Sequence, residues 1–290
     1  MEEERLQLAL ASDRAMVEPA MVVLGSLLAR TEAKLRVHFL GHGLLASDRY
    51  RLAGFCAAHD CDFVYHEVTE ADFDGARPAN SNIPLVALAR LHLPSWVEGR
   101  ILYLDCDMLV LGDVAELFAL MPQGAALGAV RDFYVLDQMA RGGDLPEKLA
   151  WHRQLLGRDD VRGYFNSGLL LMDCDVIRRE PALREQMSNV SASEGMRFMD
   201  QDYLNLIFDG QVHYLPLAWN CIWGRQARRG RSLARLVWLP EAECRPERTQ
   251  LIHYTGPRKP WKRQGLLSAL LSRRLAALRA WRREARGILG

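Results

Sequence analysis

Two aspartates one residue apart are the first candidates for chemistry in this chain. Asp105-Cys106-Asp107 follows the apolar run Ile101–Leu104, and Leu109–Leu111 is apolar again. Ligands of open α/β sheets bind outside the carboxyl ends of the strands, so both carboxylates can turn toward one cation there. Mg²⁺ and Mn²⁺ prefer oxygen ligands and often bridge to substrate phosphates. The alternative is a pair of solvated acids, which the apolar flanks disfavour.

A second group of polar residues lies near the C-terminus. A short apolar run ends at His253, and Gly256 and Lys259 follow it. An imidazole can complete a metal site begun by carboxylates. A glycine lets the backbone approach a phosphate closely, and a lysine supplies a point charge for it. A lone histidine at a strand end is more often structural, but this combination indicates a site for a metal and a phosphate.

A second class of enzyme also carries a DxD motif behind an apolar strand. Phosphatases of the haloacid-dehalogenase type use one Asp as nucleophile and the other as acid and base. Their motif usually lies near the start of the chain, with Thr or Val two positions after the second Asp. Here the motif is mid-chain, Leu109 holds that position, and Asp159-Asp160 follows no strand. The phosphatase is therefore the enzymatic alternative.

The elements that must position these residues alternate between strands and helices. Strands are predicted at Leu6–Ala11, Leu35–Leu40 and Asp62–His66, with helices at Ala20–Leu28 and Ser47–His59 between them. This order argues for an α/β fold with parallel pairing. Later strands are expected at Arg100–Asp107, Ala125–Val130, Val212–Leu215 and Leu251–Tyr254, helices at Val86–Leu93 and Asp200–Phe208, and loops at Ala71–Pro84 and Arg225–Arg235.

Length and composition narrow the class of protein. The 290 residues suit one large α/β domain with a short appendage, and the net charge of +1 gives no general attraction to nucleic acid. The six cysteines form no CxxC pair, so reduced thiols are expected. The acidic start, Met1-Glu2-Glu3-Glu4, is unlike a signal peptide, and no apolar run is long enough to span a bilayer. We predict a cytoplasmic protein.

A basic segment over residues 263–290 follows a catalytic domain predicted over residues 1–262. Its apolar residues recur near helical spacing, with arginines between them, and such a basic amphipathic helix suits an anionic membrane surface. The apolar positions are Leu267, Leu270, Leu271, Leu275, Leu278 and Trp281, and the basic ones are Arg273, Arg274, Arg279, Arg282, Arg283 and Arg286. We predict peripheral contact with the inner face of the cytoplasmic membrane. Docking on the core of the protein itself is the alternative.

Six segments in one order resemble the family 8 glycosyltransferases, a retaining group that includes bacterial lipopolysaccharide galactosyl- and glucosyltransferases. The segments are Ala9–Asp13, Ala89–Leu91, Leu102–Asp107, Phe165–Gly168, Met199–Asp202 and His253–Trp261. The resemblance runs from about Leu6 to Trp261. It implies a GT-A fold, which is a Rossmann-like mixed sheet flanked by helices, together with a UDP-sugar donor and Mn²⁺, or Mg²⁺ in its place.

The resemblance also implies a role for each matched residue. The implied metal ligands are Asp105, Asp107 and His253. The implied nucleotide contacts are Ala11, Ser12, Asp13, Asp105, Cys106, Gly256 and Lys259. The residues implied around the donor sugar are Arg90, Asp132, Asn166 and Ser167, with Asp200 and Gln201 as the catalytic pair. Separately, Trp219, Asn220 and Trp223 are candidates for an acceptor site, because aromatic faces stack on sugars, although a position in the core is more common for tryptophan.

The implied reaction retains the anomeric configuration of the sugar. A double displacement needs a carboxylate nucleophile on the far face of the sugar, and the family's position for it holds Gln201, an amide. Same-face attack is therefore predicted, with the acceptor hydroxyl entering as UDP leaves. The expected function is transfer of galactose or glucose from a UDP-sugar to a saccharide or lipid-linked oligosaccharide, in lipopolysaccharide core assembly. A non-catalytic scaffold that binds a UDP-sugar or a membrane is the alternative outside the enzymes.

Overall fold

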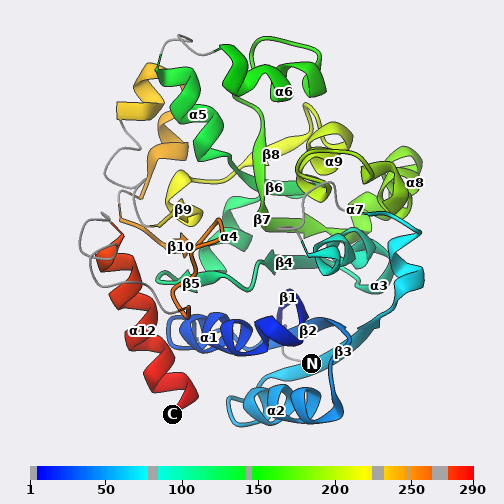
Figure 1. The fold of residues 1–290 in the computed structure, drawn as a ribbon, viewed down its shortest axis with the longest axis vertical. Coiled ribbons are helices and arrows are strands. Elements are labelled where there is room, and N and C mark those ends of the chain that lie inside the picture. Colours follow the sequence, from blue (N-terminus) through cyan, green and yellow to red (C-terminus); the bar gives the residue numbers. More distant parts are fainter. Residues whose placement is uncertain (1–4, 78–83, 142–145, 224–231, 247, 263–273) are drawn as a thin grey trace.

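A mixed sheet forms the centre of the protein (Figure 1). The computed structural model describes residues 5–77, 84–141, 146–223, 232–246, 248–262 and 274–290. Within these residues the sheet has the strand order β3-β2-β1-β4-β7-β6-β8. Its strands are β1 (Leu6–Asp13), β2 (Leu35–His42), β3 (Asp62–Val68), β4 (Arg100–Leu104), β6 (Leu127–Arg131), β7 (Phe165–Asp173) and β8 (Val212–Tyr214). A second, small sheet joins β5 (Met108–Val110), β10 (Leu251–His253) and β9 (Cys221–Ile222).

The strand directions agree with the predicted α/β fold. β1 pairs in parallel with β2 and β4, and β2 pairs in parallel with β3. β7 is antiparallel to both β4 and β6, which makes the sheet mixed. The carboxyl ends of β1, β4 and β6 therefore meet at one edge of the sheet, where ligands of such folds bind.

Helices cover both faces of the sheet because its strands are apolar on both faces. Along β1, Leu8 and Leu10 pack into one core, and Ala9 and Ala11 pack into the other. Helices α1 (Val17–Leu28), α2 (Ala46–Ala57) and α4 (Ala115–Leu120) contribute to the first core. Helices α3 (Leu93–Trp96), α7 (Cys174–Arg179), α8 (Pro181–Ser188) and α9 (Asp200–Ile207) contribute to the second. α5 (Phe133–Ala140) and α6 (Pro146–Leu156) lie together at the top of the view in Figure 1.

Three predicted segments differ in detail from the structure. The predicted helix Val86–Leu93 is a 3-10 helix over Leu85–His92, with hydrogen bonds to the third residue back. The predicted loop from residue 71 includes part of a 3-10 turn, Glu70–Phe73, which buries Phe73. Of the predicted basic loop, residues 225–231 lie outside the described residues, and residues 232–236 are helical. Burial of Leu233 and Ala234 in the core accounts for that helix.

The C-terminal helix α12 (Leu275–Leu289) packs beside α1 (Figure 1). Its apolar face is buried there, through Ala277, Leu278, Trp281 and Ala285. Gly25 of α1 makes this approach possible, since a Cβ on it would lie 2.7 Å from the Ile288 side chain. The structure therefore does not support membrane contact through this face, and it shows the alternative, docking on the protein's own core.

Other parts of the tail prediction have no structural test. Residues 263–273, which include Leu267, Leu270, Leu271 and Arg273, lie outside the described residues, so the division at residue 262 stays a prediction. No helix in the described part of the chain has both the length and the apolar character needed to cross a bilayer.

Replacing Trp281 by alanine should lower the free energy of unfolding by about 3 kcal/mol, because it removes a large side chain that is only 5% exposed. Urea denaturation followed by circular dichroism measures this difference. Arg279→Ala, on the exposed side of the same helix, is the control and should change stability little. Equal stability of wild type and Trp281→Ala would show that α12 does not dock on α1.

Candidate active site

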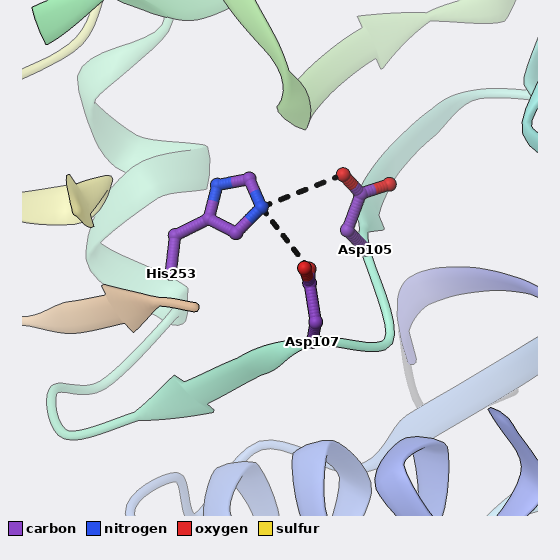
Figure 2. A group of neighbouring side chains, drawn as sticks. All are labelled: Asp105, Asp107 and His253. Atoms are coloured by element: carbon purple, nitrogen blue, oxygen red, sulfur yellow. Dashed lines mark ion pairs between the residues drawn. The ribbon is translucent and has the colours of Figure 1, made fainter. Parts of the chain in front are cut away.

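Three candidate metal ligands converge beyond the end of β4 (Figure 2). Asp105 and Asp107 lie in the turn between β4 and β5, and His253 ends β10. β10 runs antiparallel to β5 with His253 opposite Met108, so the register of this small sheet carries the imidazole to the two acids. His253 Nε2 lies 3.0 Å from Asp107 Oδ1 and 3.7 Å from Asp105 Oδ2.

The chemistry of this group fits a hard divalent cation. One ligand atom from each of the three residues lies within 4.8 Å of the others. Asp107 Oδ1 is buried and faces His253 Nε2 at 3.0 Å, so one cation could bind both atoms. Two carboxylate oxygens and one imidazole nitrogen suit Mn²⁺, and Mg²⁺ less well because of the nitrogen.

Asp107 remains ionised because of its neighbours. Lys259 Nζ donates to Asp107 Oδ2 at 2.5 Å, and His253 lies on the other oxygen. Burial alone would raise the pKa of Asp107, but the charges and hydrogen bonds of His253 and Lys259 outweigh burial and hold this pKa well below its usual range.

A glycine in β7 makes room for this cluster. A Cβ added to Gly168 would lie 2.5 Å from His253 Cε1 and 2.7 Å from Asp105 Oδ2. The backbone of Gly168 also accepts a hydrogen bond from the Asp105 amide at 2.8 Å. Only a residue without a side chain lets the ligands pack this closely on β7.

Arg90 links the metal cluster, which is the group of candidate ligands Asp105, Asp107 and His253, to the predicted sugar site. Its guanidinium is 3% exposed and donates to Asp105 Oδ1 at 2.9 Å and to the carbonyl oxygen of Ser167 at 2.6 Å. Its Nε lies 3.3 Å from Asp200 Oδ2. Burial alone would lower the pKa of Arg90, but the two carboxylates raise it, so the group stays cationic.

Asp200 and Gln201 begin helix α9 beside this cation. Ser167 Oγ donates to Asp200 Oδ2 at 2.9 Å. Burial raises the pKa of Asp200, and the nearby Arg90 opposes that shift. The residue before the helix, Met199, is buried at a φ of +42°, a region that costs a side-chain-bearing residue about 1–3 kcal/mol. This strained turn aims Asp200 and Gln201 at the end of β7.

Gln201 is held by hydrogen bonds on both sides of its amide. Its Oε1 accepts from Asn166 Nδ2 at 2.9 Å and from the Ser167 backbone amide at 3.2 Å. Its Nε2 donates to the hydroxyl of Tyr164 at 3.1 Å. Asn166 Nδ2 also reaches Asp132 Oδ2 at 3.4 Å, while Asp132 Oδ1 caps α5. The predicted sugar-site residues thus form one hydrogen-bonded group with the metal cluster.

The pairing of β6 with β7 shifts in register where these residues lie. β6 and β7 pair regularly up to Ala129 and Leu170, and then Val130 pairs with Asn166. Ser167 and Gly168 are therefore released from pairing with β6 at this point. Such bulges re-aim side chains next to functional sites.

The predicted nucleotide-binding residues contribute unequally. Ser12 is fully buried, and its hydroxyl donates to the carbonyl oxygen of Asp13. Cys106 is buried as well, with its thiol on the carbonyl oxygen of Ala11, so its side chain faces away from the metal cluster. Asp13 is partly exposed and accepts from the amide of Ala15. These residues lie at the end of β1, next to the turn that carries Asp105, and their nucleotide contacts stay predictions.

Gly256 and Lys259 follow His253, the last residue of β10. Gly256 has a φ of +85°, which only glycine adopts readily, and a Cβ there would have open space around it. Lys259 Nζ is bound to Asp107 Oδ2 and to the carbonyl oxygen of Tyr254. The turn therefore brings a cation and an open backbone to the edge of the metal cluster.

The structure corrects the predicted acceptor site and adds residues to the donor site. Trp219 and Trp223 are 0% and 3% exposed, so they form core rather than a stacking surface. Asn220 between them contacts His253 and Asn166 instead of solvent. Tyr164 and Asp202, which the sequence pattern did not indicate, hold Gln201 in place. Gln201 donates to the hydroxyl of Tyr164, which in turn donates to Asp202. Their only sequence signal is position, next to Phe165-Asn166 and Asp200-Gln201.

A family model described as Glycosyl transferase family 8 matches residues 7–265. The chain belongs to this family. Lipopolysaccharide 1,2-glucosyltransferase of Escherichia coli strain K12 is 32% identical over 172 residues, which cover 56% of this chain and 44% of that protein. A putative glycosyltransferase of Haemophilus influenzae is 22% identical over 264 residues, which cover 90% and 74% of the two chains.

Solved structures show the same fold. The galactosyltransferase LgtC, in complex with donor and acceptor sugar analogs, aligns with a TM-score of 0.76 and 24% identity over 98% of this chain and 97% of that one. An active-site mutant of LgtC aligns with a TM-score of 0.78 and 22% identity, with the same coverage. The predicted family and its GT-A fold are confirmed. The family match also favours a transferase over the phosphatase alternative.

The depressed pKa of Asp107 predicts how acid affects stability in metal-free protein. Because the folded-state pKa lies below the ordinary 3.8, ionised Asp107 stabilises the fold above about pH 4, and this contribution is lost as the pH falls further. Asp107→Asn should therefore lose less unfolding free energy than the wild type as the pH falls below about 4. Urea denaturation in EDTA at a series of pH values measures the slope.

An exposed acid supplies the control for this measurement. Glu185→Gln in α8 should keep the wild-type slope. Identical slopes for wild type and Asp107→Asn would show that His253 and Lys259 do not stabilise the Asp107 carboxylate.

Proposed function

We propose that this protein transfers a hexose, galactose or glucose, from a UDP-sugar to a saccharide acceptor with retention of configuration, and that it depends on Mn²⁺. The observation that carries the proposal is the convergence of Asp105, Asp107 and His253 with Lys259 at the carboxyl edge of the sheet. Three metal ligands beside a lysine provide for a diphosphate leaving group and its counter-ion in one place. The names of the family relatives support the same class of reaction.

The leaving group is the part of the substrate that this site serves best. A bound Mn²⁺ would supply Lewis-acid stabilisation of the charge that develops on the diphosphate. Asp105, Asp107 and His253 would hold the metal. Lys259 adds a positive charge on the same side, and the open backbone at Gly256 admits a phosphate closely. Both groups are in place before the substrate arrives, so little reorganisation accompanies bond breaking.

The donor-sugar side of the site favours same-face attack. A double displacement needs a carboxylate that is free to attack the anomeric carbon. Asp200 is 4% exposed, and its Oδ2 is occupied by both Ser167 and Arg90. Gln201 is an amide whose oxygen already accepts two hydrogen bonds. In our proposal the acceptor hydroxyl therefore enters on the face that UDP leaves, and the diphosphate takes its proton.

Arg90, Asp132, Asn166 and Ser167 act as positioning groups for the donor sugar in this proposal. Arg90 and Asp200 neutralise each other while buried, so they define a rigid polar wall. Gln201 retains one N–H beyond the bond to Tyr164, and that donor is available to a sugar oxygen. Holding the sugar in a fixed pose lowers the entropic part of the barrier.

The acceptor and the cellular setting rest on the relatives. A lipopolysaccharide core acceptor fits the names of the Escherichia coli relatives, although the aligned segment spans less than half of the first one. We also propose a cytoplasmic location. Contact with the inner face of the membrane would have to use the exposed arginines of α12, because its apolar face is covered by α1.

Metal-dependent release of UDP from a UDP-sugar tests the proposed function directly. Incubation with a panel of UDP-sugars in Mn²⁺, without acceptor, should release UDP from one of them, and EDTA should abolish the release. Asp105→Asn should reduce it by about 10²–10³, since one electrostatic contribution to the transition state is lost. Coupled detection of free UDP measures the rate.

The same experiment separates the alternatives to the proposal. A non-catalytic scaffold would bind UDP with Mn²⁺ in calorimetry without turnover, even after saccharide acceptors are added. A phosphatase would release inorganic phosphate from a phosphate ester and ignore the UDP-sugars. Either result would overturn the transferase.

Lys259→Ala should lower kcat by about 10²–10³, because the leaving diphosphate loses a charge positioned in advance. Steady-state kinetics measure the effect, with the UDP-sugar that the release assay identifies as the donor. Lys262→Ala removes an exposed lysine three residues on and should keep wild-type kinetics. Equal kcat in the two variants would remove Lys259 from the leaving-group site.

A further inference from the structure

A continuous chain of side-chain hydrogen bonds leads from the metal ligand to the far side of the sugar site. It runs from His253 to Asn220, Asn166, Gln201 and Tyr164, with heavy-atom distances of 2.9, 2.8, 2.9 and 3.1 Å, and then to Asp202 at 2.6 Å. Asn220 joins the two halves of the site and is 4% exposed.

The direction of this chain is fixed at its middle by backbone amides. The amide of Gly168 donates to Asn166 Oδ1 at 3.1 Å, and the amide of Ser167 donates to Gln201 Oε1 at 3.2 Å. A backbone N–H only donates, so each side-chain amide must present its oxygen there. Rotating the Asn166 amide would place its NH₂ on the Gly168 N–H and its oxygen on the carboxylate of Asp132.

The far end of the chain is fixed independently by a buried carboxylate. Asp202 is 0% exposed, and its Oδ2 accepts from the indole of Trp151 and the amide of Phe198. Its Oδ1 accepts from the hydroxyl of Tyr164. Burial and the charge of Asp202 raise the pKa of Tyr164 well above its ordinary value, so the phenol keeps the proton it donates. Tyr164 must then accept from Gln201 Nε2.

The orientation of Asn220 and the proton on His253 follow from the fixed orientations of Asn166 and Tyr164. Asn166 presents its oxygen to Asn220, so Asn220 must turn its Nδ2 to Asn166 and its Oδ1 to His253 Nδ1. The nitrogen that faces this oxygen must donate, so His253 carries a proton on Nδ1. Nε2 is then the ring nitrogen left for a metal, and Figure 2 shows it facing both aspartates while the other is turned away.

We propose that Asn220 is a positioning residue that holds His253 in the Nδ1–H tautomer, and so makes Nε2 a metal ligand, with its own orientation dictated by Asn166. The inference rests on the proposed role of His253 in metal binding. Partners of this kind typically change metal affinity by about 10–100-fold when they are removed. Asn220 also makes the metal site and Gln201 parts of one hydrogen-bonded unit.

The proton on Nδ1 is measurable without any metal. Long-range ¹H–¹⁵N correlation spectra of ¹⁵N-histidine protein in EDTA should show that Nδ1 of His253 is protonated. A His253→Gln variant assigns the signal. Asn220→Ala should lose the Nδ1 proton in whole or in part. A wild-type His253 without a proton on Nδ1 would overturn the proposal.

Metal affinity supplies the second readout. Titration of Mn²⁺ in the presence of UDP, followed by electron paramagnetic resonance of the free ion, should show about 10–100-fold weaker binding by Asn220→Ala. Asn220→Asp keeps an oxygen on His253 Nδ1 but loses the donor to Asn166, so its affinity should fall less than that of Asn220→Ala. Asn205→Ala is the matched control, since Asn205 is equally buried but binds only the backbone of Phe165 and Gln201.

The outcomes decide between the proposals. Wild-type affinity in Asn220→Ala, or an equal loss in Asn205→Ala, would overturn the role of Asn220. Failure of the wild-type protein to bind Mn²⁺ would instead overturn the proposed metal dependence. The metal-free spectra would still report the tautomer in that case.

Discussion

The buried cation of Arg90 is the interaction on which the candidate site depends. A guanidinium that is 3% exposed is costly unless charges and hydrogen bonds compensate it. Asp105 and Asp200 supply the charge, and the carbonyl oxygens of Ala87 and Ser167 accept from Nε and Nη1. Because these partners come from separate elements, Arg90 can be satisfied only when β4, β7 and α9 are in place together.

Arg90 also causes the two oxygens of the Asp105 carboxylate to face different partners. Oδ1 accepts from Arg90 and from the hydroxyl of Tyr103, which leaves Oδ2 directed toward His253. The oxygen that the proposed metal would bind is therefore selected by a residue that is not itself a candidate ligand. The same principle applies to His253, whose orientation we assign to Asn220. Both proposed metal contacts are thus arranged by partners in the surrounding core.

The sequence predicted the parts of this site that follow from local pattern. Asp105 and Asp107 stand out because an apolar strand precedes them, and the alternation of strands and helices places that strand end at a binding edge. The roles of Asn220 and Asp202 could not be predicted in this way, because their partners lie 33 and 38 residues away. Amphipathic spacing likewise identified the apolar face of α12. It did not identify α1 as the helix that covers this face, because that contact depends on the absence of a side chain at Gly25.

The charges of the site explain why a catalytic arrangement can persist before substrate binds. Asp105, Asp107 and Asp200 would repel one another in a buried space. Arg90 and Lys259 pair with all three, so the acids can lie close together. Asp107 Oδ1, which faces His253 Nε2, would gain a further partner from a bound cation. A cation bound there satisfies that oxygen in the folded state alone, so metal binding and stability of this edge of the sheet are linked.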